Sequence, residues 1–139
     1  MIKIKNKFNF FLIVLNLIFL IYYSFQLLVF TDEFAEKNIG FFNHAVAGLS
    51  EIIGIIFFCL ALGLISIIFV GATNQFPLFF TILIIHCILA INFWRYFFTD
   101  APGEAEMASI VYNASLFSLM FLSMFVLFIR LKKSLFNFL

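Results

Sequence analysis

The sequence predicts an all-α integral membrane protein built as an antiparallel up-down-up-down four-helix bundle. Hydrophobic residues make up 65% of the 139 residues and charged residues only 11%, which leaves too little polar surface for a water-soluble globule. A helix that crosses the bilayer needs roughly 20 apolar residues. Windows of this kind cover residues 8–30, 41–70, 76–98 and 107–129. We therefore expect residues 1–139 to form a single four-helix transmembrane domain.

The first window begins after a run of lysines, a pattern that also precedes secretory signal sequences. The apolar run continues through "IYYSFQLLVF" without a small-residue cleavage pattern, and it is longer than the core of a usual signal peptide. We interpret residues 8–30 as an uncleaved first helix. The connection that follows, "TDEFAEKNIG", is expected to hold a helical turn on the outer surface, with Thr31 as its cap and Phe34 in the membrane interface.

The second window carries a polar and small-residue face. His44, Ala47 with Gly48, Glu51 and Gly54 recur at spacings of three and four, so they share one side of a helix. Small residues allow a neighbouring helix to approach closely, so Ala47, Gly48 and Gly54 are expected to pack against another helix. Glu51 on this face is expected to point into the bundle, because an unpaired carboxylate in hydrocarbon costs a few kcal/mol.

The third and fourth windows supply the groups that could meet Glu51. Pro77 starts the third window, where a proline costs no helical hydrogen bond. At about 1.5 Å per residue, Glu51, His86 and Ser118 all lie about 15 to 18 Å below the outer helix ends. A second layer lies within about 10 Å of the outer surface and contains His44, Asn92, Arg95 and Asn113. This predicts a polar pocket that opens to the non-cytoplasmic side.

The charges at the ends of the windows predict the orientation in the membrane. Basic residues flank the first and last windows, whereas acidic residues dominate the first and third connections. By the positive-inside rule, both termini face the cytoplasm. The basic residues are Lys3, Lys5 and Lys7 before the first window and Arg130, Lys132 and Lys133 after the last; the acids are Asp32, Glu33, Glu36, Asp100, Glu104 and Glu106.

Several chemistries do not fit the pattern. His44 and His86 differ in depth by about 14 Å, which disfavours a bis-histidine haem, and no third ligand suggests zinc, so no metal is expected. Cys59 and Cys87 are about 11 Å apart in depth, too far for a disulfide. We find no catalytic motif and no basic surface for nucleic acid. The "NAS" at Asn113 matches a glycosylation site but lies inside a span.

The stretch "GLSEIIGIIFFCLALGL", together with the hydropathy layout and the acidic first connection, resembles the DoxX-like group of small four-helix membrane proteins. The group's second span carries Gly, Glu and Gly three residues apart, which correspond to Gly48, Glu51 and Gly54. This sequence departs from the group in its first helix, which has no glycine and carries Gln26. The resemblance implies a bacterial-type inner-membrane protein, with some relatives linked to quinone or sulfur redox complexes.

Two functions remain open from the sequence. The first is a non-enzymatic accessory or self-associating subunit, embedded in the lipid bilayer as a homo-oligomer or within a larger membrane complex. The alternative is a binder of a quinone or lipid-like ligand in the outward pocket, centred on Glu51 and His86 as hydrogen-bonding or proton-handling groups. In that case His44, Arg95, Asn113 and Ser118 would be its other candidate residues. No cofactor is expected other than such a quinone. The structural alternative for all these residues is interhelical hydrogen bonding that fixes the bundle's register, which also applies to Asn16 and Asn92.

Overall fold

The computed structural model describes residues 4, 6–99 and 105–136, with side chains to residue 131, and this part of the chain is helical without any strand. The five helices are α1 (Lys7–Val29), α2 (Thr31–Ile39), α3 (His44–Val70), α4 (Phe76–Phe98) and α5 (Met107–Phe136). In α1, α3, α4 and the Met107–Leu131 part of α5, the chain is long and apolar enough to cross a membrane. These spans begin and end close to the predicted windows, because a long apolar run has no other way to satisfy its backbone polar groups in lipid.

Local signals in the sequence set the helix ends. The Asn6 side chain caps α1 by accepting hydrogen bonds from two backbone N–H groups, at 3.0 and 3.2 Å, and the Asn43 side chain caps α3 by accepting one, from Val46 at 2.8 Å. Pro77 lies in the first turn of α4, as expected. Gly40 and Gly71 follow α2 and α3 with φ of 91° and 99°, a backbone conformation that glycine adopts without the strain of a side chain.

The first connection is a complete helix, α2, and it begins differently from the prediction. Thr31 is not its cap: the capping position is Phe30, which makes no side-chain cap hydrogen bond. Because α2 starts directly after α1 ends, the Thr31 hydroxyl instead donates to the Leu27 carbonyl in the last turn of α1, at 2.7 Å. The Phe34 ring faces Tyr23, with centroids 6.3 Å apart. Phe34 therefore packs against α1, and it is half-buried.

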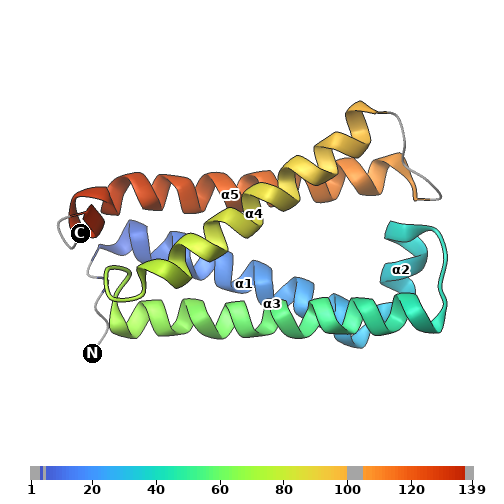
Figure 1. Ribbon diagram of the computed structural model, residues 1–139, viewed down its shortest axis with the longest axis horizontal. Helices are drawn as coiled ribbons and strands as arrows, with labels where there is room; N and C mark the ends of the chain where they lie inside the picture. The colour runs from blue at the N-terminus through green and yellow to red at the C-terminus, as the bar shows by residue number, and fades with distance from the viewer. Residues whose placement is uncertain (1–3, 5, 100–104, 137–139) are drawn as a thin grey trace.

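The long helices form two closely packed pairs, α1 with α3 and α4 with α5, and α1 also contacts α5. In Figure 1 successive long helices run in alternate directions across the molecule, and α4 is inclined to α3. The two helices α3 and α4 share little contact. They come close where Gly63 meets Leu78, because a Cβ on Gly63 would lie only 3.0 Å from the Leu78 Cδ2 atom.

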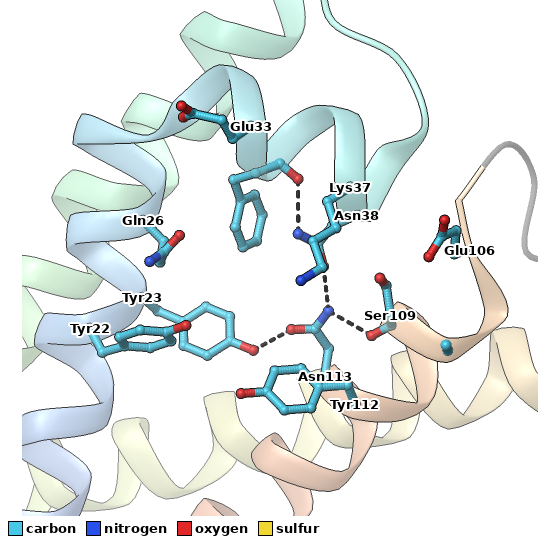
Figure 2. Close-up of a pocket in the computed structure, with 12 residues that line it drawn as sticks. Tyr22, Tyr23, Gln26, Glu33, Lys37, Asn38, Glu106, Ser109, Tyr112 and Asn113 are labelled. Carbon is cyan, nitrogen blue, oxygen red and sulfur yellow. Dashed lines mark hydrogen bonds between the residues drawn. The ribbon is translucent and has the colours of Figure 1, made fainter.

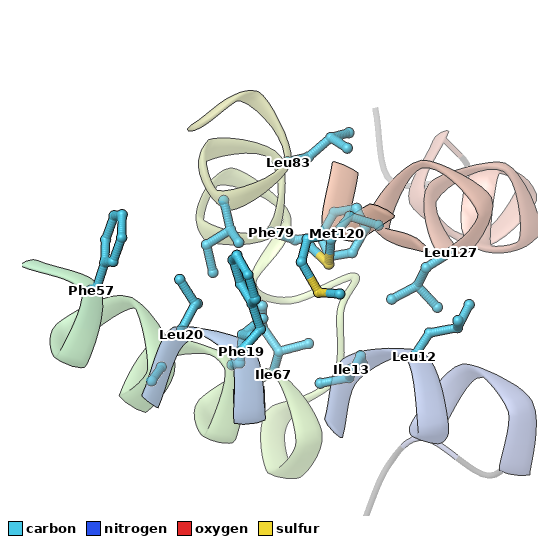
Figure 3. Packing of buried hydrophobic residues seen from close by; sticks show 14 of the residues in the cluster. Leu12, Ile13, Phe19, Leu20, Phe57, Ile67, Phe79, Leu83, Met120 and Leu127 are labelled. Carbon is cyan, nitrogen blue, oxygen red and sulfur yellow. The ribbon is translucent and has the colours of Figure 1, made fainter. Parts of the chain in front are cut away.

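A core of aliphatic, aromatic and methionine side chains fills the space between the helix pairs (Figure 3). Outside this core the long helices expose large apolar side chains on most of their surface, which is the pattern expected when the surrounding solvent is lipid. The largest fully buried apolar side chains are Ile13, Leu20, Leu64, Ile67, Phe79, Ile82, Phe117, Met124 and Leu127.

Candidate functional site

Glu51 does not point into the bundle, which corrects the sequence-based expectation. The face of α3 that packs in the core carries Ser50, Gly54, Phe57 and Ala61, whereas Glu51 is exposed. Each residue turns a helix by about 100°, so Ser50 and Glu51 face different directions. Spacings of three and four residues occur both on the face with Ser50 and on the face with Glu51. The contact with α1 buries the Ser50 face and leaves the Glu51 face exposed.

The small residues of α3 behave differently along the helix. At Gly54 two leucine side chains of α1 approach closely: an added Cβ would lie 2.8 Å from Leu28 Cγ and 3.0 Å from Leu27 Cβ. The Ser24 hydroxyl of α1 also donates to the Gly54 carbonyl, at 2.9 Å. At Gly48 nothing lies within 4 Å of an added Cβ, and Ala47 is half-buried. Close helix approach is therefore found at Gly54 and not at Gly48.

His86 lies in the core, away from Glu51. It is fully buried between the rings of Phe19 and Phe117, with centroid distances of 5.7 and 6.2 Å. Neither of its ring nitrogens has a hydrogen-bond partner among the described residues. The structure thus does not bring Glu51 and His86 together as a pair, and the predicted pocket is not centred on them.

The other sequence candidates separate as well. His44 and Arg95 are exposed, and the Arg95 guanidinium stacks on the Tyr96 ring at 4.8 Å. Ser118 accepts a hydrogen bond from the Trp94 Nε1 group at 2.9 Å and donates to the carbonyl one turn earlier. These three residues form no common site. Asn113 alone among the ligand-binding candidates lines the polar pocket described below.

Three polar contacts join α1 to α5 along their length. Asn9 accepts from the Arg130 Nε group at 2.7 Å, the Asn16 amide donates to the Ser123 hydroxyl at 2.6 Å, and the Tyr23 hydroxyl donates to Asn113 Oδ1.

The α1 residues in these contacts are seven apart, so they lie on one face of the helix. In lipid, such contacts between helices fix how one helix is positioned against the next. Asn16 and Asn113 therefore make the interhelical bonds that the structural alternative predicted.

A polar pocket of about 390 Å³ lies at the end of the molecule where α1, α2 and the start of α5 meet. One wall contains Asn113, whose amide donates to Asn38 Oδ1 and to the Ser109 carbonyl, each at 2.8 Å, while its oxygen accepts from Tyr23 (Figure 2). The Asn38 amide in turn donates to the Phe34 carbonyl at 2.9 Å. This network connects three helices and fixes one wall of the pocket.

Charged and aromatic side chains form the rest of the pocket. Glu33 and Lys37 come from α2 and Glu106 precedes α5; all three are exposed, and none of them is in an ion pair within the part of the chain that the structure describes. In Figure 2 the two carboxylates lie on opposite sides of the pocket. The other lining residues are Tyr22, Gln26, Phe34, Ala108, Ser109 and Tyr112.

Most of this pocket was missed by reasoning from the sequence. The pocket lies at the end of the molecule that holds the first connection, and of the predicted ligand-binding residues it contains only Asn113. The available signal was the heptad of Asn9, Asn16 and Tyr23 on α1. This spacing could have indicated the face of α1 that contacts α5, and so the hydrogen bond between Tyr23 and Asn113. The fold of α2 over this contact, which brings in Asn38, has no comparable signal.

Asn113 is buried and hydrogen-bonded through both ends of its amide, so the "NAS" sequence does not present a free acceptor for glycosylation. Cys59 and Cys87 are free thiols. Among the described residues no group of three or more His, Cys, Asp or Glu side chains could hold a metal ion. Comparisons with protein-family models, curated proteins and solved structures found no match for this chain.

Proposed function

We propose that this protein is a non-enzymatic subunit of a membrane assembly, either self-associating or accessory to a larger complex. In this proposal the four long helices form an up-down-up-down bundle of DoxX-like type in a bacterial-type inner membrane, with both termini in the cytoplasm. The four apolar helices support the membrane location. The charge distribution at their ends supports the orientation.

One observation carries the proposal: Glu51 is exposed on a helix that is otherwise suited to lipid. Its neighbours Ile52 and Ile55 are also exposed, so the carboxyl lies within an apolar surface. Glu51 is seven residues from the start of α3, or about 10 Å along the helix. A charged group in the membrane costs about 2.5–3.5 kcal/mol when it lies at the helix centre and faces lipid. A second protein surface that hydrogen-bonds the carboxyl removes this cost.

The same face of α3 continues as a stripe suited to helix packing. Ile55, Phe58 and Leu62 follow Glu51 at spacings of four, three and four, and all are exposed. A neighbouring helix on this stripe would cover the carboxyl and the apolar residues below it together. We therefore place the assembly contact on the Glu51 side of α3.

Photo-crosslinking at Ile55 tests the contact in intact membranes. With benzoylphenylalanine in place of Ile55, we expect one discrete crosslinked product, and its mass distinguishes a second copy from another protein. Ile88 on α4 is the matched control, because it is exposed to a similar extent, 59% against 54% for Ile55. When Glu51→Leu is added to the variant that carries benzoylphenylalanine at position 55, the yield of the crosslinked product should fall. Equal crosslinking from Ile55 and Ile88, or none from Ile55, would contradict the proposal.

A further inference from the structure

The pocket between α1, α2 and α5 does not include Glu51 or any other residue of α3, so its ligand is considered separately from the assembly contact. We propose that it binds an ammonium group joined to a phosphate, as in the headgroup of an aminophospholipid such as phosphatidylethanolamine. Three features of the pocket lead to this chemistry: its charges, its aromatic rings and its place at the end of the spans.

The charges favour a ligand with a cationic end. Glu33 and Glu106 supply two carboxylates and Lys37 one ammonium, so these lining groups carry a net charge of −1 (two negative, one positive). The carboxylates are free to accept hydrogen bonds from a ligand, because no ion pair within the described residues uses them. A primary ammonium offers three donors to such groups. In the proposed complex, the Lys37 ammonium binds the phosphate of the same headgroup.

The aromatic residues suit the same ligand. Tyr22, Tyr112 and Phe34 line the pocket, and the faces of aromatic rings attract ammonium groups. The hydroxyls of Tyr22 and Tyr112 also make no hydrogen bond within the described part of the chain, so they can bind phosphate or glycerol oxygens. A neutral quinone ring would leave the surrounding charges without partners, and therefore fits this pocket less well.

The position of the pocket favours a lipid over a free amine. It lies at the ends of α1 and α5, where the exposed Tyr22 and Tyr112 are in the position of interfacial aromatic residues. From each tyrosine an exposed apolar surface continues toward the middle of the span, through Ile18 on α1 and Leu119 on α5. A headgroup in the pocket would leave the acyl chains against these surfaces. The volume of about 390 Å³ is in the range of small-ligand pockets.

The network behind the pocket keeps its shape. Tyr23, Asn38 and Asn113 are bonded to one another rather than directed at a ligand, so they hold the three helices in place. Recognition then depends on the charged residues at the rim. This separation allows the rim to be changed without disturbing the wall.

The test uses the full-length protein purified in a mild detergent and short-chain phosphatidylethanolamine as the probe, with binding measured by native mass spectrometry and by thermal stabilisation. We expect Glu33→Gln or Glu106→Gln to weaken binding about threefold each, and the double variant about tenfold, as partly exposed charge pairs do. Glu36→Gln is the matched control, since Glu36 is an exposed acid on the same helix but does not line the pocket. It should bind as the native protein does.

Two further probes complete the test. Free phosphoethanolamine that binds as tightly as the lipid would identify a soluble source of the same headgroup chemistry, whereas weaker binding identifies the lipid. Short-chain phosphatidylglycerol lacks the ammonium and should bind at least about threefold more weakly than phosphatidylethanolamine. Equal binding of the two lipids, or an equal loss in Glu36→Gln and Glu106→Gln, would overturn the proposal. None of these outcomes depends on crosslinking at Ile55.

Discussion

Asn113 and His86 are both buried polar residues, but they differ in what surrounds them. Asn113 uses its oxygen and its amide to bond residues on α1, α2 and its own helix. His86 lies among aromatic rings, and its two nitrogens have no partner within the described residues. A buried polar atom without a hydrogen bond costs free energy. The two side chains are therefore expected to have opposite effects on stability.

Replacing His86 with leucine, which is similar in volume, should stabilise the protein. The substitution removes two unpaired polar atoms from the core, so we expect the free energy of unfolding to rise by about 1 to 2 kcal/mol. Asn113→Leu should lower it by about 1 to 2 kcal/mol, because the Tyr23 hydroxyl and the Asn38 oxygen lose their partner. Thermal unfolding in detergent measures both. A loss of stability in His86→Leu would contradict the expectation that the unpaired histidine destabilises the core.

The two contacts that α1 makes with other long helices depend on different kinds of side chain. Between α1 and α3 the contact depends on a small residue, Gly54, where the Ser24 hydroxyl also reaches the α3 backbone. Between α1 and α5 it depends on polar contacts such as Asn16 with Ser123. The heptad spacing on α1 aligns that second set. As a result α1 carries two faces with separate roles and links the two helix pairs.

The α1–α3 contact predicts a difference between two glycines of one helix. Gly54→Val should destabilise the protein by about 1 to 3 kcal/mol, because the new side chain would collide with Leu27 and Leu28. Gly48→Val is the matched control, because nothing lies within 4 Å of an added Cβ there. Thermal unfolding of the purified variants compares them. Similar losses at both positions would show that helix propensity, rather than packing, sets the effect.

The approximate limits of the four long helices and their apolar character could be predicted from the sequence, because hydropathy is a local signal. The cap of α2 was predicted wrongly, because Thr31 bonds the last turn of α1 instead. The rotation of α3 could not be predicted: Ser50 and Glu51 are adjacent, and only the neighbouring α1 selects Ser50 for the interior. The rise per residue predicts similar depths along the bundle axis for His86 and Glu51. Equal depth does not bring two side chains to the same side of a bundle. The polar pocket required the fold of α2 over α1 and α5, which brings Asn38 to Asn113.

At the scale of the whole molecule, the two ends of the helix bundle differ in their polar and charged residues. The α2 end carries the polar pocket with its charged lining residues, and the opposite end carries Lys7 at the start of α1 and Arg130, which is bonded to Asn9. In the sequence, further basic residues precede α1 and follow Arg130. In the orientation that we propose from the positive-inside rule, the α2 end faces away from the cytoplasm. The pocket and the orientation are therefore linked, because a pocket that opens to the outer leaflet requires the termini inside.

Labelling of single cysteines measures this orientation. In a background with Cys59→Ser and Cys87→Ser, we expect Glu36→Cys on α2 to react with a membrane-impermeant maleimide in right-side-out vesicles. Asn74→Cys, in the turn between α3 and α4, should react only after the vesicles are permeabilised; both residues are exposed in the folded chain. Labelling of Asn74→Cys alone in sealed vesicles would contradict the orientation and place the pocket at the cytoplasmic leaflet. Equal labelling of both positions would mean that the chain between them does not cross the membrane as α3.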